Sequence, residues 1–191
     1  MGLRKIRLLG DPVLREKTHK VTRFNENLKT LVEDMAETMR HSNGVGLAAP
    51  QVGVSERIIV VETPKEEEEA GSGRLYAVVN PEIVRAAEEQ VDGIEGCLSI
   101  PGYVGEVTRY EAVTIKGHDL QGRKIRIKAQ GFLARVFQHE IDHLEGILFI
   151  DQLTAPDRIW RVEEGEEEQA EAAGTIEELM PVDIPAELTQ V

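Results

Sequence analysis

The segment GFLARVFQHEIDHLEG, residues 131–146, holds two histidines four positions apart, His139 and His143, with Glu140 directly after the first. On a helix, residues four apart lie on one face, so both imidazoles of such a pair can reach a single metal ion. A carboxylate alongside can contact a water on that ion. The pattern alone fits a metallopeptidase, another metal-dependent hydrolase, or two buried histidines without a metal.

A helical wheel of residues 132–145 predicts a helix that is mostly buried. Its one polar stripe consists of Arg135, Gln138, Asp142 and Glu145. The two histidines lie beside this stripe, next to Phe132 and Val136. Glu140 lies about 60° from His143, on the flank of the histidine face. This arrangement favours a dry metal site with a carboxylate beside it over incidental histidines.

Two histidines do not complete a catalytic metal site, so a third ligand is needed. The extended metallopeptidase pattern HExxHxxGxxH matches as far as Gly146, but Phe149 stands where the last histidine belongs. Glu163 and Glu164 lie further downstream, in an acidic and weakly patterned tail. They are poor candidates for a ligand, and the metallopeptidase interpretation fails at this point.

The single cysteine, Cys97, is the one soft ligand that the chain offers. It stands in EGCLSIPGY, where Gly96 permits a close backbone approach and Pro101-Gly102 ends the segment. One thiolate and two imidazoles would leave a fourth tetrahedral position for water, on an ion that could be iron, nickel, cobalt or zinc. A lone cysteine is otherwise a small buried hydrophobic residue, and that interpretation stays open.

Three segments together resemble the signature motifs of the peptide deformylase family: GVGLAAPQ at 44–51, EGCLS at 95–99 and HEIDH at 139–143. IRLLGDPVLR at 6–15 is similar to the family's usual start, so the resemblance covers roughly residues 4–155. It implies an α+β fold, with antiparallel sheets around a central helix that carries the HExxH motif. The function that it implies is removal of the N-terminal formyl group from N-formylmethionine of newly synthesised polypeptides.

The resemblance also implies a role for each residue of the site. Cys97, His139 and His143 would hold one divalent metal ion, Fe(2+) in most such enzymes, with Zn(2+), Ni(2+) or Co(2+) as substitutes. Metal-bound water would attack the formyl carbonyl, with Glu140 as general acid/base. Gln51, through its side-chain amide, and Leu98, through its backbone N–H, would stabilise the oxyanion.

Four further residues would contact the substrate: Val45 and Gly46 in the cleft, and Phe132 and Val136 around the methionine side chain. Taken alone, GVGLAAPQ also fits a Gly-rich helix exit followed by an apolar turn, with Gln51 on the surface. Glu95 and Asp142 are either surface charges or carboxylates that orient a ligating histidine.

Regular elements can be predicted around these motifs. Residues 25–42 have helical spacing of apolar residues, with Asn25 as the N-cap and Asn43-Gly44 as the stop, and predict an amphipathic helix. Strands are predicted at 57–62, at 74–80 and along 104–116, with a hairpin near Gly122. The glutamate run of KEEEEAGSG predicts a solvated loop.

The composition predicts one domain with an acidic tail. The 191 residues are 41% hydrophobic and carry a formal net charge of -13, which disfavours binding to DNA or RNA. Residues 151–191 contain 12 acidic and 2 basic side chains. We expect a catalytic domain at 1–155 and an acidic extension at 156–191 that is partly helical or flexible, in which Ile176, Leu179 and Met180 could dock.

The expected setting is the cytoplasm, because the sequence shows no signal peptide and no membrane span. One cysteine permits no intrachain disulfide, which suits a reducing compartment. We expect a monomer that acts on N-formylmethionyl peptides and nascent chains, with a transient ribosome contact that the acidic tail does not favour. The alternatives are a zinc peptidase and a catalytically silent, metal-stabilised binding module, and the latter would need neither Glu140 nor Gln51.

Overall fold

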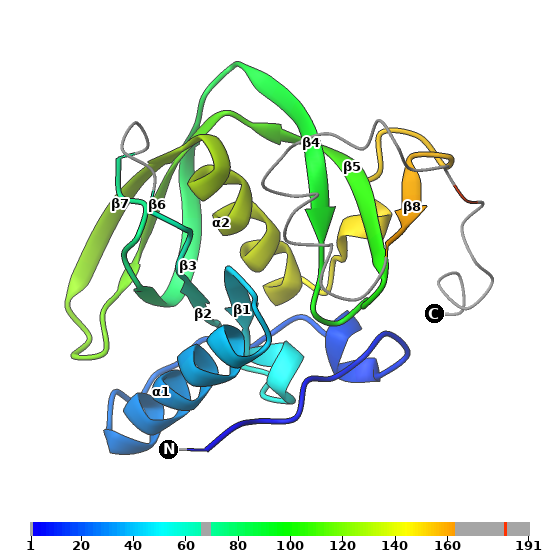
Figure 1. The fold of residues 1–191 in the computed structure, drawn as a ribbon. Coiled ribbons are helices and arrows are strands. Elements are labelled where there is room, and N and C mark those ends of the chain that lie inside the picture. The colour runs from blue at the N-terminus through cyan, green and yellow to red at the C-terminus, as the bar shows by residue number, and fades with distance from the viewer. Residues whose placement is uncertain (1, 66–69, 163–181, 183–191) are drawn as a thin grey trace.

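A computed structural model describes residues 2–65, 70–162 and 182, and it has the predicted α+β fold with antiparallel sheets (Figure 1). The helices are α1 (Glu26–His41), α2 (Gly131–Leu144) and three short 3-10 helices, η1 (Pro12–Arg15), η2 (Ala49–Val52) and η3 (Phe149–Asp151). One sheet has the order β1 (Gly46–Ala48), β2 (Ile58–Val61), β3 (Tyr76–Ala86), β6 (Ala112–His118) and β7 (Lys124–Gln130). The other has the order β4 (Gln90–Gly96), β5 (Tyr103–Tyr110) and β8 (Ile159–Arg161).

The five-stranded sheet is covered on both faces at β2. Ile58 and Val60 belong to the apolar cluster that contains α1, whereas Ile59 and Val61 belong to the cluster that contains α2. Successive residues of a strand point to opposite faces, and apolar residues cover both faces here. All four side chains are therefore buried. This double cover explains why β2 is a continuous apolar run rather than an alternating one.

Helix α1 begins and ends at the predicted signals. The side chain of Asn25 accepts a hydrogen bond from the backbone N–H of Leu28 at 3.1 Å, which satisfies one of the free donors of the first turn. After the helix, Asn43 takes a left-handed conformation with φ 53°, and the N–H of Gly44 bonds back to Met39. The turn that follows leads directly into β1.

The run 104–116 is two strands of different sheets. Its first part is β5 and its second part is β6, and the chain bends at Glu111, whose N–H donates to the carbonyl of Glu89. Apolar periodicity does not detect such a bend, because both strands alternate with the same period. The short strands β1 and β8 also lack a sequence signal, as does β4, whose residues QVDGIEG are largely polar.

Helix α2 lies in the middle of the molecule, between the five-stranded sheet and the β4–β5 hairpin (Figure 1). It begins at Gly131, whose φ is +56°, directly after β7. Strand β4 ends at Gly96, so Cys97 is the first residue beyond it. The helix with both histidines and the strand that leads to the cysteine therefore lie side by side.

Some of the predicted features fall on residues outside the described part of the chain. These are the acidic stretch from Glu163 onward, with Ile176, Leu179 and Met180, and the glutamates 66–69. The hairpin near Gly122 is described, and it joins β6 to β7 with a φ of +77° at that glycine. Within the described residues, no helix combines the length and the apolar character that crossing a membrane requires.

Phe137 of α2 offers a test of how the central helix is held. Its side chain is fully buried in the cluster between α2 and the five-stranded sheet, with its ring centroid 5.5 Å from that of Tyr76. We expect Phe137→Ala to lower the free energy of unfolding by about 3–5 kcal/mol in urea titrations. Val84→Ala removes a partly exposed side chain and should cost below about 1 kcal/mol; equal losses would contradict this packing.

Candidate metal centre

Helix α2 and the segment after β4 bring three possible metal ligands together, one thiol and two imidazoles. The ligand atoms of Cys97, His139 and His143 all lie within 4.8 Å of one another. The Sγ of Cys97 is 3.3 Å from Nε2 of His143, and the two imidazole centroids are 4.9 Å apart. Both histidines are buried, and Cys97 is partly buried. One thiol and two imidazoles at this separation are a donor set that fits iron, zinc, nickel or cobalt.

The electrostatics of the two rings also fit a cation at this point. Burial lowers the pKa of His139, but its hydrogen bonds to Cys97 and Glu95 outweigh burial and raise this pKa well above its ordinary value. Burial lowers the pKa of His143 well below its ordinary value, and the charge of His139 lowers it further. Both rings and the thiol of Cys97 meet at one place, and a divalent ion could take that place with all three as donors.

A buried carboxylate orients the ring of His139. The Nδ1 of His139 lies 3.0 Å from Oε2 of Glu95, which directs the other ring nitrogen towards Cys97. Glu95 is only 3% exposed and so belongs to the interior, not to the surface. Of the two interpretations that the sequence left open for Glu95, the geometry favours the orienting carboxylate.

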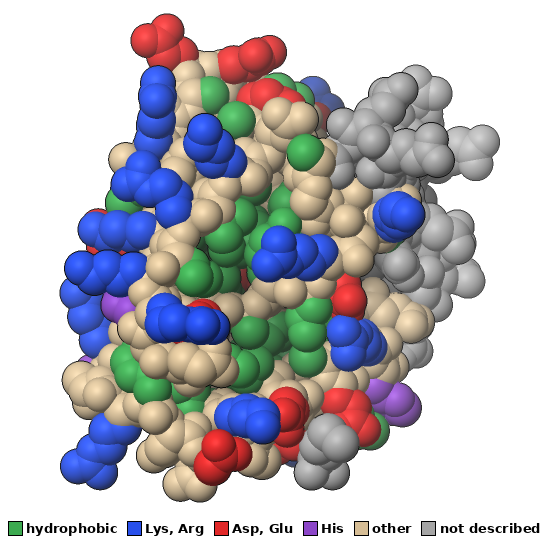
Figure 2. Space-filling view, turned by 90° about the vertical axis from the view of Figure 1, so that its left-hand side faces the viewer, with side chains coloured by type: hydrophobic (Ala, Val, Ile, Leu, Met, Phe, Trp, Pro, Cys, Tyr) green, Lys and Arg blue, Asp and Glu red, His purple; other side chains and the backbone are tan. Residues whose placement is uncertain are grey.

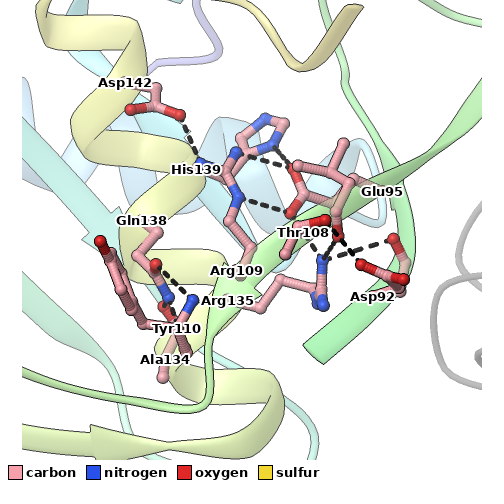
Figure 3. Close-up of polar contacts among 12 residues, drawn as sticks. Asp92, Glu95, Thr108, Arg109, Tyr110, Ala134, Arg135, Gln138, His139 and Asp142 are labelled. Atoms are coloured by element: carbon pink, nitrogen blue, oxygen red, sulfur yellow. Dashed lines mark hydrogen bonds and ion pairs between the residues drawn. The ribbon is translucent and has the colours of Figure 1, made fainter. Parts of the chain in front are cut away.

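Two arginines hold Glu95 as an anion (Figure 3). Arg109 donates to both carboxylate oxygens, at 2.8 and 3.0 Å, and Arg135 donates to one of them at 3.0 Å. Burial alone would raise the pKa of Glu95, but Arg109 and His139 outweigh it and lower this pKa far below its ordinary value. Arg109 also donates to Asp142 of α2, so the network joins β4, β5 and α2.

Three of the four residues in the polar stripe that the helical wheel predicted on α2 face the β4–β5 hairpin, whereas Glu145 pairs with Arg57 and Lys17. Gln138 bonds through its amide to both backbone groups of Tyr110, and Arg135 and Asp142 join the network around Glu95. Sequence reasoning missed Arg109 and Arg135 as parts of the site. An arginine within the apolar strand YVGEVTRY was the available signal, because such a charge needs a buried partner.

Gln51 is buried beside the ligands and points its amide nitrogen at them. Its Oε1 accepts a hydrogen bond from the N–H of Ala48 at 2.8 Å, which fixes the orientation of the amide. The Nε2 then lies 3.5 Å from Sγ of Cys97 and 3.2 Å from Oγ of Ser99. The alternative that placed Gln51 on the surface is wrong, since the side chain is 1% exposed.

Glu140 is buried against Gly46 of β1, on the flank of the histidine pair. A Cβ at Gly46 would come within 2.2 Å of Oε1 of Glu140, so only glycine leaves room for the carboxylate here. Gly46 belongs to GVGLAAPQ, and this close approach is one physical reason for a glycine in that motif.

A cavity of about 610 Å³ opens beside the three candidate ligands, and Cys97 and His139 line it. Five residues that the sequence named as substrate or oxyanion contacts line it: Val45, Gly46, Gln51, Leu98 and Val136. Phe132 is absent from the lining that the described residues form, and packs instead against the core around α2. It lies one helical turn before Val136, nearer the start of α2, which takes it away from the ligands.

The same cavity has walls that the sequence did not predict. They come from the segment before η1 and from the end of α1: Ile6, Leu8, His41, Ser42 and Asn43. The sequence gives only a weak signal for Ile6 and Leu8, because an apolar pair two residues apart predicts no more than an extended segment.

Glu95→Gln tests the network around His139. The change leaves the side-chain shape but removes the charge between two arginines, so Arg109 keeps a buried charge with less compensation. We expect the free energy of unfolding to fall by about 3–5 kcal/mol in denaturant titrations. Glu106→Gln, on β5, removes a carboxylate whose partners are exposed, and should cost about 1 kcal/mol or less. A loss for Glu95→Gln as small as that of the control would show that the buried pair is not needed.

Comparison with known proteins agrees with this geometry. Residues 3–158 match the family model described as polypeptide deformylase. The peptide deformylase of Thermomicrobium roseum is 51% identical over 174 residues, which cover 91% of this chain and 98% of the relative. The peptide deformylase of Symbiobacterium thermophilum is 53% identical over 169 residues, covering 88% and 73% respectively.

Solved structures give the same result. The peptide deformylase of Thermotoga maritima superposes with a TM-score of 0.74 at 43% identity, over 80% of this chain and 99% of that one. That of Ehrlichia chaffeensis, in complex with actinonin, gives 0.77 at 41% identity, over 81% and 90%. The chain therefore belongs to the peptide deformylase family, the metal-dependent hydrolases that remove N-terminal formyl groups from newly synthesised polypeptides.

Proposed function

We propose that this chain removes the formyl group with one divalent ion held by Cys97, His139 and His143. The observation that carries the proposal is the convergence of these three ligand atoms beside an open cavity. The ion, when bound, supplies a Lewis acid that makes water a nucleophile near neutral pH. Fe(2+) is the ion that we expect in the cell, with Zn(2+), Ni(2+) or Co(2+) able to replace it, because a mixed thiolate and imidazole set accepts all four.

In this proposal Glu140 moves the protons of the reaction. Its carboxylate is packed between the histidine face of α2 and Gly46, at the wall of the cavity. There it can take a proton from the attacking water and deliver it to the departing amine. The close packing on Gly46 restricts the carboxylate to this place, which keeps it aligned for both transfers.

Gln51 and Leu98 would stabilise the negative charge that develops on the formyl oxygen. The amide of Gln51 is already aimed by Ala48, so its Nε2 donor needs no reorientation when substrate binds. The backbone N–H of Leu98 would provide the second donor. A formyl carbon carries only hydrogen beyond its amide, and a small site is enough to exclude acetyl groups and internal peptide bonds.

The rest of the cavity would receive the peptide. We propose that Val45 and Gly46 line the cleft and that Val136 contacts the methionine side chain, with N-formylmethionyl peptides and nascent chains as substrates. Actinonin occupies the Ehrlichia chaffeensis relative, and we expect it to bind in the cavity of this chain as well. Phe132 would act only indirectly, by supporting the start of α2.

We further propose that the protein acts as a cytoplasmic monomer. Residues 1–155 would form the catalytic domain, and 156–191 an acidic extension whose first residues include β8, the third strand of the smaller sheet. All 22 Lys and Arg lie in the described residues, together with only 21 of the 35 acidic residues. The net charge of the whole chain is therefore a poor guide to the surface of this part.

A transient ribosome contact would use the basic face of β6 and β7. Lys124, Arg126 and Lys128 are exposed on β7, and Lys116 of β6 stands directly opposite Arg126. Figure 2 shows Lys and Arg side chains gathered along the left-hand side of this view. Lys116 is ion-paired with Glu82 of β3 at 3.1 Å, which offsets its repulsion from Arg126. The three exposed charges of β7 are the part of this face that a phosphate backbone would contact.

Glu140→Gln tests the proposed proton transfers. The amide has nearly the same shape but cannot accept the proton, so we expect kcat for formylated peptide to fall at least about 100-fold while the bound metal stays stoichiometric. Elemental analysis measures the bound metal, and the rate of formate release measures kcat. Retained activity with metal bound would rule out this role for Glu140.

Arg126→Glu with Lys128→Glu tests the basic face. We expect binding to ribosomes in sedimentation assays to weaken about tenfold or more at low salt, with deformylation of a short peptide unchanged. Lys5→Glu with Arg161→Glu makes the same change in charge away from β6 and β7, and should leave binding within about twofold. Equal weakening by both pairs would mean that only the total charge matters.

A further inference from the structure

Arg135 joins the helix that carries the histidines to the hairpin that leads to the cysteine. Its Nη1 donates to the carbonyl of Val107 at 2.8 Å and to that of Gly93 at 3.3 Å. Its Nη2 donates to the carbonyl of Val91 at 2.7 Å. With the bond to Glu95, one guanidinium from α2 thus holds both β4 and β5 (Figure 3). The planar fork of arginine can make these bonds at once, whereas the single ammonium of lysine cannot.

The place of this contact relates it to the metal centre. Arg135 is one helical turn before His139 on α2, and Gly93 is four residues before Cys97 on the segment of β4. The two elements carry different ligands, and this contact fixes them to each other close to where the ligands meet. A shift of β4 along α2 would change the separation of Cys97 from both histidines.

Gly93 leaves the space that the guanidinium of Arg135 occupies. A Cβ at residue 93 would lie 2.7 Å from Nη2 and 2.8 Å from Cζ of Arg135. Gly93 does not have a positive φ, so its backbone conformation is open to any residue and only the space is limiting. The missing side chain lets Arg135 lie flat against the hairpin.

We propose that Arg135 is a positioning residue that sets the distance between Cys97 and the histidine pair, and so the affinity of the site for its metal. This inference rests on the proposed metal site of the preceding section. Arg135 touches no ligand itself, and acts through β4 and through Glu95, which orients His139. Partners of this kind commonly change metal affinity by about 10- to 100-fold.

Two independent substitutions disturb the same contact. Arg135→Ala removes the guanidinium, and Gly93→Ala displaces it while leaving the charge in place. We expect each to speed release of Zn(2+) from the holoenzyme to a chelator about tenfold or more, and to weaken the thiolate-to-metal absorption of the Co(2+)-loaded protein. Because both act on one contact, the double variant should release metal no faster than Arg135→Ala alone.

Arg57→Ala is the matched control. Arg57 is as buried as Arg135 and also ties α2 to a strand, with bonds to Glu145 beyond the helix and to the carbonyl of Pro81. It should lower the free energy of unfolding while leaving metal release within about twofold. Gly93→Ala and Arg135→Lys keep the test possible if Arg135→Ala does not fold.

The outcomes separate the two proposals. A wild-type protein that shows no thiolate-to-Co(2+) absorption would overturn the metal site itself. Normal metal release in Gly93→Ala and Arg135→Lys would overturn the positioning role while leaving the site intact. Equal acceleration by Arg57→Ala, or additive effects of the two site variants, would show that the loss reflects general stability and would also overturn it.

Discussion

The proposed metal centre depends on one buried carboxylate, that of Glu95, which stands where β4, β5 and α2 meet. Its oxygens accept from Arg109, Arg135 and His139, so one side chain connects the strand before Cys97 with the helix that carries both histidines. Helix α2 alone does not define the site, since Cys97, one of the three proposed ligands, lies on another element. The distances between Cys97 and the two histidines therefore depend on how firmly the β4–β5 hairpin is held against α2.

Such a network is an unusual way to hold a core together. Burying an ion pair costs desolvation of both charges, and apolar residues of the same volume often stabilise a protein as well or better. Here the charged hydrogen bonds fix the orientation of the side chains, which apolar packing fixes less strictly. Glu95 selects the ring nitrogen of His139 that faces Cys97, and Arg109 keeps Glu95 ionised. The apolar cluster on the other side of α2, around Phe137, supplies the packing that the network does not.

Much of the site was predictable because its chemistry is local in the sequence. The four-residue spacing of His139 and His143 on a buried helix, and the lone Cys97 between glycine and leucine, make these residues candidates for a metal site, and the fold brings them together. The roles of Gln51 and Leu98 came from family resemblance, since nothing in GVGLAAPQ alone shows which way an amide points. The orientation of Gln51 depends on the N–H of Ala48, a contact that only the fold provides.

The remaining differences between the sequence predictions and the structure share a physical cause. Polar strands such as β4 give little period-2 signal, and a bend such as that at Glu111 leaves the alternation on both sides unchanged. Phe132 looked equivalent to Val136 on a helical wheel, which records angle but not distance along the helix axis. Arg109 and Arg135 were missed because their value depends on partners that are distant in the sequence.

X-ray absorption at the metal edge of anaerobically purified protein is the decisive experiment for this metal centre, because it detects the ligands themselves. A site of Cys97, His139 and His143 predicts one sulfur at about 2.3 Å and two imidazole nitrogens at about 2.0–2.1 Å if the ion is zinc. The sulfur contribution should disappear in Cys97→Ser. A spectrum without sulfur in the unaltered protein, or one in which Cys97→Ser changes nothing, would rule out this set of ligands.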